Sequence, residues 1–401
     1  MMKRLIYLSV AVFSLAAAVP AQIRVVKSAD RKITLDLSGL RAGSDADSRR
    51  FFQTLEKDLQ LSGWFTPVRG NGELRLIGTA NPDGSNLKSI CQVYRGADQA
   101  RLFSKSYSIE SGRARALAHR VADDIVEAIT GNKGIASCRI ALVGNRTGRK
   151  ELYLCDMDGG GLMQVTQDKK IVIGPSWSPD GGSIVYTSFL RGFPDVYRID
   201  LQRGRRELLA SYGGLNTGSA ISPDGKDLAL ILSKDGNPEL YIKNLRNGKL
   251  TRLTMTARAT EGSPSWAPDG ENLVYVSDSS GTPQLYIISR AGGRPRRLSS
   301  RGSENVAPDW GPNGMIACAS RSGGRYAIAV IHPQTGETRY MQTDYADYED
   351  PSWAPDGRHI VAGRTAGHQS SIYLLDTAGN APAPLLQGNG NWFSPDCSPT
   401  R

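Results

Sequence analysis

The residue types that most often do chemistry in proteins are scattered along this chain of 401 residues. Its histidines stand at 119, 332, 359 and 368, and no Gly-x-Ser-x-Gly, P-loop or His-Glu-x-x-His motif occurs. The run Asp156-Met157-Asp158-Gly159 resembles the start of a calcium loop but lacks the later acidic positions of an EF-hand, so a β-turn is the better interpretation. The sequence therefore predicts no enzyme, no cofactor and no metal site.

The cysteines are a second set of candidates, at positions 91, 138, 155, 318 and 397. Because their number is odd, at least one thiol is unpaired within the chain, and a disulfide scaffold is excluded. Cys138 and Cys155 flank one predicted hairpin. They could be joined across its strands or be two ordinary buried thiols, and the sequence leaves both interpretations open.

Repeated turns dominate the C-terminal two thirds of the chain. The stretch Pro175-Ser-Trp-Ser-Pro-Asp-Gly181 recurs as near-copies, with the second proline at 179, 223, 268, 312, 355 and 395. The steps are 44, 45, 44, 43 and 40 residues, which is typical of a β-propeller. Proline fixes φ, aspartate accepts a bond from its own backbone and glycine takes a positive φ, so each copy suits a tight hairpin.

Each repeat divides into four short strands, which in the second blade are 175–178, 183–188, 195–199 and 207–210. A tyrosine in the third strand recurs at 153, 197, 241, 286 and 373, giving six registers if the blade around 327–331 lacks it. The first register has no Trp-Ser-Pro-Asp strand before it, and the last copy, Trp392–Asp396, has no blade after it. We therefore expect this last strand to complete the first blade and close a six-bladed ring, which removes the free sheet edges.

A different pattern precedes the propeller. Apolar residues recur at helical spacing over 45–61 and 113–130. Strand-like runs cover 33–37, 74–80, 87–94 and 101–109. Strands with helices packed on them make an α+β domain, and the run 131–134 is a hinge candidate. The predicted fold is mainly β, with a six-bladed β-propeller at 135–401 preceded by a small α+β domain at 22–134.

Residues 1–21 are typical of a secretory signal peptide. Lys3 and Arg4 precede the apolar run Leu5–Val19, and Val19-Pro20-Ala21 is a small-residue cleavage site. The apolar run is shorter than the roughly 20 residues that a membrane span needs. No cysteine stands directly after the cleavage site, where a lipid anchor would be attached. We expect cleavage near Ala21, leaving an exported chain without a lipid anchor or stable membrane insertion.

Composition is that of a globular chain, with 39% hydrophobic and 22% charged residues. The formal net charge of +10 falls to +8 once Lys3 and Arg4 are removed. A basic balance can point to nucleic acid or anionic lipid, but Lys and Arg are scattered and form only short clusters at 203–206 and 294–297. This favours solvated loop charge and no nucleic-acid partner.

Several segments together resemble the TolB family, the periplasmic propeller proteins of the Tol–Pal envelope system. They are the start Ile23-Arg24-Val25-Val26, the helix end Asp58–Phe65, the segment Ile129–Gly134 before the propeller, and the terminal Trp-Phe-Ser-Pro strand. The Ser-Pro-Asp-Gly repeat alone recurs in many exported propellers. Its combination with this N-terminal domain is much more discriminating.

The resemblance implies a non-enzymatic periplasmic adaptor that supports envelope constriction at division. In the family, the N-terminal segment engages TolA of the inner-membrane complex, and one propeller face binds Pal, the peptidoglycan-associated lipoprotein. Ile23, Arg24, Val25 and Val26 match the TolA-binding segment, and so short an apolar strand would add to a partner's sheet edge. The alternative is a strand held against its own α+β domain.

For Pal, the loops that enter each inner strand converge at the channel mouth. Their candidate contacts are Asn216, Thr217, Arg258, Glu261, Glu304, Asn305, Tyr348, Glu349, Asp350, Asn389 and Asn391. The sequence departs from the family here, since Leu215 aligns with a family histidine, and Gly262 and Ser263 align with a Thr-Glu pair. A second function also stays open: a periplasmic propeller that binds a small ligand, glycan or cation in its channel.

Overall fold

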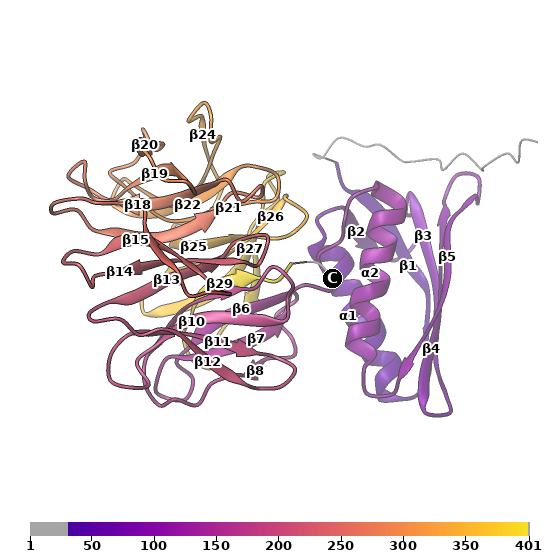
Figure 1. Ribbon diagram of the computed structural model, residues 1–401. Coiled ribbons are helices and arrows are strands. Elements are labelled where there is room, and N and C mark those ends of the chain that lie inside the picture. Colours follow the sequence, from indigo (N-terminus) through magenta and orange to yellow (C-terminus); the bar gives the residue numbers. More distant parts are fainter. Residues whose placement is uncertain (1–30, 400–401) are drawn as a thin grey trace, which may run out of the picture.

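The computed structural model describes residues 31–399, which form two domains side by side (Figure 1). The predicted signal peptide and the segment Ile23–Val26 lie outside the described residues. Within the part of the chain that is described, no helix is long and apolar enough to cross a membrane.

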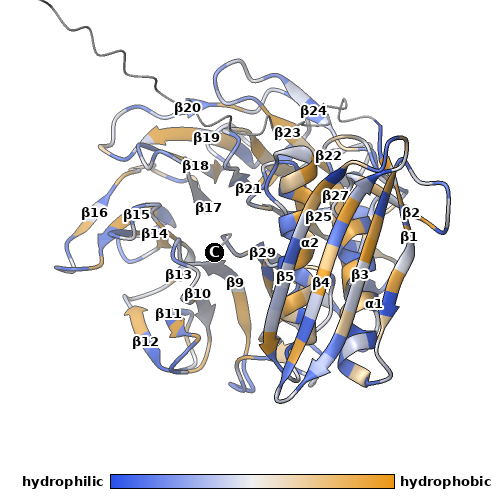
Figure 2. Cartoon of the chain, turned by 90° about the vertical axis from the view of Figure 1, so that its right-hand side faces the viewer, coloured by the Kyte–Doolittle hydropathy of each residue, from blue (hydrophilic) through white to orange (hydrophobic). Residues whose placement is uncertain are grey.

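The N-terminal domain is a five-stranded sheet with two helices on the face toward the propeller (Figures 1 and 2). Its elements are β1 (Ile33–Ala42), α1 (Ala46–Leu61), β2 (Phe65–Val68), β3 (Leu74–Asp83), β4 (Asn86–Arg95), β5 (Arg101–Glu110) and α2 (Ala114–Thr130). The strand order is β2-β1-β3-β4-β5, and β1 runs parallel to both of its neighbours. The sequence missed β2, because four residues that include Pro67 carry little periodicity.

The two helices begin, end and pack as their sequences predict. Asp45 caps α1 by accepting a hydrogen bond from Ser48 N at 2.8 Å, and Gly131 ends α2 in the left-handed region with φ 75°. The apolar stripe of each helix, including Phe51 and Val121, is fully buried against the sheet in one core. Burying one such side chain contributes about 2 kcal/mol, so this packing fixes both helices on the sheet.

The segment between the domains is pinned rather than free. Asp123 on α2 accepts hydrogen bonds from Ala136 N at 2.8 Å and Ser137 N at 2.9 Å, and Ile135 is buried. A Cβ built on Gly134 would lie within 3 Å of the Asp123 side chain. The predicted hinge at 131–134 is therefore followed at once by a segment held to α2.

The propeller consists of six antiparallel four-stranded sheets, as predicted. Blades 1 and 2 contain β29 (Trp392–Cys397), β6 (Arg139–Gly144), β7 (Glu151–Asp156), β8 (Met163–Gln164), β9 (Val172–Trp177), β10 (Ser183–Ser188), β11 (Asp195–Asp200) and β12 (Arg206–Ala210). Blades 3 and 4 contain β13 (Asn216–Ile221), β14 (Asp227–Leu232), β15 (Glu239–Asn244), β16 (Leu250–Arg252), β17 (Glu261–Trp266), β18 (Asn272–Ser277), β19 (Gln284–Ser289) and β20 (Arg296–Arg297). Blades 5 and 6 contain β21 (Glu304–Trp310), β22 (Ile316–Ser322), β23 (Arg325–Ile331), β24 (Thr338–Tyr340), β25 (Asp347–Trp353), β26 (His359–Ala366), β27 (Gln369–Asp376) and β28 (Ala383–Leu386).

The predicted ring closure is confirmed by the pairing of β29 with β6. Trp392 lies opposite Gly144, and Cys397 lies opposite Ile140. The Trp392 ring is fully buried and packs edge-on against Tyr153, with 5.2 Å between ring centroids. The last strand of the chain therefore supplies both hydrogen bonds and core to the first blade.

The predicted register of this closing strand is wrong by four residues. In β17, β21 and β25, a residue with positive φ precedes the first proline of the repeat, and in β29 this residue is Ser394, with φ 45°. Pro395 is therefore equivalent to Pro351 rather than to Pro355, and Cys397 takes the place of Trp353. Measured at the first proline, the steps from 264 to 308, 351 and 395 are 44, 43 and 44 residues, so the short last step disappears.

All five cysteines are free and buried. Cys155 lies opposite Ile140 on β6, not opposite Cys138. Burial raises the pKa of the Cys155 thiol to about 12, which keeps it protonated and unreactive at neutral pH. The second of the two interpretations, ordinary buried thiols, is the one that the structure shows.

Candidate partner-binding face

The propeller has two faces built from different loops. On what we call the domain-side face, turns join the third to the fourth strand of each blade and, in blades 2 to 6, the first to the second strand. The N-terminal domain covers part of the ring on this side (Figure 2). On the opposite side, which we call the open face, lie the loops between second and third strands and the loops that enter each first strand. The open face lies away from the N-terminal domain (Figure 1).

The first contact on the domain-side face is a buried charge cluster between α2 and blade 1. Arg115 Nη2 lies 2.8 Å from Asp156 Oδ2 and also pairs with Asp158. His119 lies between Asp58 of its own domain, at 2.7 Å, and Asp156 of the propeller, at 3.3 Å. Burial opposes the charged imidazole, but hydrogen bonds to Asp156 and Asp58 outweigh it and raise the pKa of His119 to about 9. The cluster thus joins the domains through a protonated histidine and an arginine.

This cluster also contains the described residues that come nearest to a metal site, His119, Asp156 and Asp158. The Arg115 guanidinium already pairs with both carboxylates, so a cation is present there without a metal. Gly159 N donates to Asp156 O at 2.8 Å, which confirms the predicted β-turn. These acidic residues hold the two domains together.

A second cluster joins the domains at blade 6. Arg358 donates from Nε and Nη2 to Asp376, each at 2.8 Å, and its guanidinium carbon lies 4.2 Å from the centroid of the Trp64 ring. His359 Nδ1 lies 2.6 Å from Asp356. Burial opposes the charge of His359, but Asp356 and Asp376 outweigh it and raise its pKa to about 9. His119 therefore bridges the two domains directly, whereas His359 pairs with propeller carboxylates beside Arg358.

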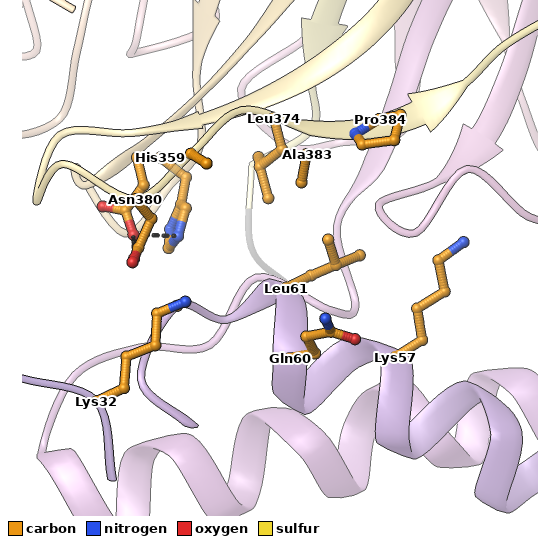
Figure 3. Close-up of a pocket in the computed structure, with 12 residues that line it drawn as sticks. Lys32, Lys57, Gln60, Leu61, His359, Leu374, Asn380, Ala383 and Pro384 are labelled. Atoms are coloured by element: carbon orange, nitrogen blue, oxygen red, sulfur yellow. Dashed lines mark hydrogen bonds and ion pairs between the residues drawn. The ribbon is translucent and has the colours of Figure 1, made fainter. Parts of the chain in front are cut away.

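A cavity of about 320 Å³ lies between the two clusters (Figure 3). Lys32, Lys57, Gln60 and Leu61 come from the N-terminal domain, and Leu374, Ala383 and Pro384 come from blade 6. Lys57 Nζ donates to the Asp158 carbonyl at 2.6 Å, so one of the two lysines also belongs to the contact with blade 1.

The open face differs because several of its exposed side chains are large and apolar. Nine large hydrophobic residues of the described chain are exposed, and five of them stand in open-face loops: Ile171, Leu190, Phe193, Met255 and Tyr345. The exposed fraction is 79% for Met255 and 85% for Tyr345. The other four lie on the outer strands β8 and β12 and on β3 and β4 of the N-terminal sheet. Apolar surface left in water on one face marks a contact region.

Buried polar residues hold the open-face loops in place. Glu151, at the start of β7, accepts hydrogen bonds from Lys169 N at 2.7 Å and Thr166 Oγ1 at 2.6 Å. Glu239, at the equivalent start of β15, accepts one from Thr256 N at 2.6 Å, directly beside Met255. The loops are therefore positioned by carboxylates that the core of the blade fixes.

Tyr345 is presented in a similar way. Its neighbour Asp344 is paired with Arg364 and accepts a hydrogen bond from Tyr348 OH at 2.9 Å. The Arg325 guanidinium carbon lies 3.2 Å from the centroid of the Tyr345 ring, which places a cation against this exposed aromatic.

Four of the eleven predicted Pal contacts are buried: Asn216, Glu261, Asn305 and Tyr348. Asn216 Oδ1 accepts from Tyr212 N at 2.8 Å, and Asn305 Nδ2 donates to Gln284 Oε1 at 2.9 Å. Glu261 accepts from Ser277 Oγ at 3.0 Å, and burial raises its pKa to about 7. These side chains shape the loops and offer little surface to a partner.

The other seven predicted contacts are at least partly accessible: Thr217, Arg258, Glu304, Glu349, Asp350, Asn389 and Asn391. Asp350 accepts a hydrogen bond from Ser394 Oγ, and Asn391 Oδ1 accepts one from Ser370 N, so both also serve the closing strand. Arg258 and Asn389 are fully exposed. The sequence-based prediction did not include Met255, Tyr345 and Phe193, although each is a large apolar residue inside an otherwise polar loop.

Serine and aspartate side chains of the inner strands bond from blade to blade around the centre of the propeller. Asp309 Oδ2 accepts from Trp353 N and Asp396 Oδ2 accepts from Trp177 N, both at 2.7 Å. Ser352 Oγ donates to Asp396 at 3.2 Å. Burial raises the pKa of Asp396 to about 7. Each bond joins one blade to the next, so these carboxylates stabilise the ring.

Comparisons with known proteins agree with this architecture. A family model described as the TolB beta propeller domain matches residues 126–401. A TolB homolog of Chlorobium chlorochromatii is 32% identical over 189 residues, which are 46% of this chain and 42% of the relative. A second homolog, from Chlorobaculum tepidum, is 31% identical over 233 residues, which are 52% of this chain and 53% of the relative. The matches thus span about half the length of these curated relatives.

The structure of TolB from Acinetobacter baumannii is similar over both domains. It superposes with a TM-score of 0.83 at 26% identity, covering 92% of this chain and 98% of that chain. The similarity therefore extends beyond the propeller to the arrangement of the whole described chain.

Proposed function

This chain belongs to the TolB family, and from that membership we propose that it is a periplasmic, non-enzymatic adaptor of the Tol–Pal system. It binds a peptidoglycan-associated lipoprotein through the open face of the propeller and a TolA-type inner-membrane protein through its N-terminal segment. This link supports outer-membrane invagination and envelope integrity during cell division.

The observation that supports the lipoprotein contact is the exposure of Met255 and Tyr345 on the open face. Interfaces concentrate binding energy in a few aromatic, arginine and other large side chains that become buried in the complex. Tyr345 with Arg325, and Met255 with the nearby exposed Arg258, are such groups. The contact with the N-terminal domain offers fewer, because Arg115, Arg358 and the two histidines there are already paired.

The N-terminal contact rests on the resemblance of Ile23–Val26 to the family segment. In the sequence this segment precedes β1, and Lys32, directly before β1, lines the cavity between the domains (Figure 3). An apolar strand of four residues binds by pairing with a sheet edge, so its affinity depends on main-chain hydrogen bonds and two or three side chains.

Calorimetry with purified proteins tests both contacts separately. The chain from residue 22 is titrated with the soluble domain of a peptidoglycan-associated lipoprotein and with the periplasmic domain of a TolA from the same organism. We expect the double variant Met255→Ser/Tyr345→Ser to bind the lipoprotein about tenfold or more weakly and to keep its TolA affinity. Deletion of residues 22–27 should do the reverse.

Leu208→Ser is the matched control, since Leu208 is an exposed apolar residue on the outer strand β12. It should leave both affinities unchanged. A folded wild-type chain that binds no lipoprotein would contradict the proposal, and so would a Leu208→Ser variant that loses as much affinity as the double variant.

A further inference from the structure

The other exposed apolar residues of the open face, on blade 2, form one patch. Ile171 is 46% exposed, Leu190 is 40% exposed and Phe193 is 73% exposed. The two loops that carry them are joined, because Phe189 N donates to Ile171 O at 2.9 Å. Met255 and Tyr345 belong to loops of other blades, so this patch is separate from the proposed lipoprotein contact.

The cations that look scattered in the sequence gather around this patch. The open-face loops of blades 1 and 2 carry Arg146, Arg149, Lys150, Lys169, Lys170 and Arg191. All are exposed except Lys150, which is half-buried with its ammonium 4.6 Å from the centroid of the Phe393 ring. Val172 N donates to Lys150 O at 3.0 Å, which places the loop of blade 1 beside Ile171.

The carboxylate in these loops does not neutralise the surface. Asp168 pairs with Arg206 at 2.8 Å and accepts a hydrogen bond from Ser188 Oγ at 2.6 Å, and its side chain is only 4% exposed. Asp195, at the start of β11, is also buried and lies 3.8 Å from Arg191. The solvent-exposed surface of the patch therefore has an apolar centre flanked by positive charge.

The loops of the patch reach into open space at two glycines. Phe193 stands near the tip of its loop, next to Gly192, and a Cβ built on Gly192 would meet nothing within 4 Å. The same holds for Gly148 in the loop of blade 1. A protein partner of ordinary affinity buries roughly 800 Å² of matched surface on each side. Separate protruding tips fit better into a surface that can deform around them.

We propose that this patch, made of Ile171, Leu190, Phe193 and the six surrounding cations, contacts the surface of a bilayer that contains anionic phospholipid. The three apolar tips enter the boundary between headgroups and acyl chains, and the cations face the phosphates. One patch of this size gives weak, reversible binding that needs a second contact for stable attachment. The lipid contact would thus add to binding of a membrane-anchored partner without replacing it.

Vesicle flotation tests the proposal. The chain from residue 22 is mixed with vesicles of phosphatidylglycerol and phosphatidylcholine, or of phosphatidylcholine alone, at low and high salt. We expect flotation with the anionic vesicles at low salt and its loss at high salt. Lys169→Glu/Lys170→Glu should weaken binding about fivefold or more for each charge. Leu190→Ser/Phe193→Ser should weaken it at low salt as well.

Two control variants match these changes away from the patch. Arg246→Glu/Lys249→Glu alters two exposed cations in the domain-side turn between β15 and β16, and Leu208→Ser alters an exposed apolar residue of β12. Both should float like the wild type, and circular dichroism checks that every variant is folded.

Absence of flotation with anionic vesicles would overturn the proposal, as would equal losses in the control variants. If the patch variants lose affinity for the lipoprotein domain in calorimetry while no protein floats, the patch belongs to a protein interface and the lipid contact is wrong. Lipoprotein binding lost in Met255→Ser/Tyr345→Ser with flotation intact would show that the two surfaces act independently.

Discussion

The two faces of the propeller use the same kinds of residue in opposite ways. Where the domain-side face meets the N-terminal domain, Arg115 of α2 and Arg358 of blade 6 are paired with carboxylates, and two histidines are buried between acids. On the open face, arginines and lysines reach solvent beside exposed Phe193, Met255 and Tyr345. Charges that pair with each other within the chain mark a permanent contact between its domains. Apolar side chains that stay exposed mark a contact with another molecule.

The difference follows from the loops that build each face. The domain-side turns between first and second strands repeat Pro-Asp-Gly or Pro-Asn-Gly, because proline and a glycine at positive φ fix the hairpin. The open-face loops vary in length and sequence from blade to blade, although buried groups such as Glu151 and Glu239 hold them at equivalent points. Because the blades hold these loops at fixed points, the loop sequences can vary and carry binding residues.

Removing Arg115 gives the largest expected effect on the domain-side face. Arg115→Leu leaves Asp158, which is 2% exposed, without its cation, while Asp156 keeps His119, and an uncompensated buried charge costs about 3 kcal/mol or more. Urea unfolding followed by circular dichroism should show the N-terminal domain separating from the propeller at lower urea. Arg198→Leu is the control, because its exposed pair with Glu207 contributes less than about 1 kcal/mol. Equal losses in both variants would contradict the comparison of the faces.

Gly63 tests the second cluster with a smaller expected effect. Its φ is +71°, and a Cβ there would lie 2.5 Å from Asp376 Oδ2 and 2.9 Å from Arg358 Nη2. Gly63→Ala should lower the free energy of unfolding, measured by urea unfolding, by about 2 kcal/mol, because it strains the backbone and displaces the Arg358–Asp376 pair. Gly84→Ala isolates the strain, since Gly84 has φ +59° and open space around its Cβ position. If Gly63→Ala costs no more than Gly84→Ala, the cluster tolerates displacement and holds the domains only loosely.

The pH dependence of stability should come from the same face. The pKa values of His119 and His359 are raised to about 9, so their stabilisation is complete below their unfolded value near 6.5 and is lost as pH rises through 9. Melting temperatures measured from pH 7 to pH 9.5 should fall. In His119→Gln, the loss of unfolding free energy over this pH range should be smaller than in the wild type by about 1 to 2 kcal/mol. His368→Gln, at an exposed histidine, should keep the wild-type slope. If stability depends on pH equally in His119→Gln and His368→Gln, the stabilising proton is not bound by His119 in this cluster.

The architecture could be predicted from the sequence because it depends on periodic features. Prolines and glycines at intervals near 44 residues give the blades, and helical spacing of apolar residues gives α1 and α2. The register of the closing strand could not be predicted by matching Ser-Pro-Asp, because Pro395 stands in the first proline position and Cys397 replaces the tryptophan. The strand pairing and the positive φ of Ser394 reveal this, and the even spacing of the first prolines agrees with it.

The surface was less predictable, because exposure depends on how loops fold over one another. Asn216, Asn305 and Tyr348 stand at the expected places but turn inward to hold their loops. The six cations of blades 1 and 2 come from three segments between 146 and 191, which only the antiparallel hairpins bring together. Spacing in the sequence shows neither of these effects.

The smallest expected change in stability is on the open face, and it is the most direct test of the comparison. Met255→Ser/Tyr345→Ser removes two apolar side chains that are mostly in water already, so the free energy of unfolding should stay within about 0.5 kcal/mol of wild type. The same variant should elute earlier from a hydrophobic-interaction column, because its exposed apolar area is smaller. A loss above about 1 kcal/mol would show that these side chains belong to the fold. An unchanged stability with weaker lipoprotein binding would assign them to function alone.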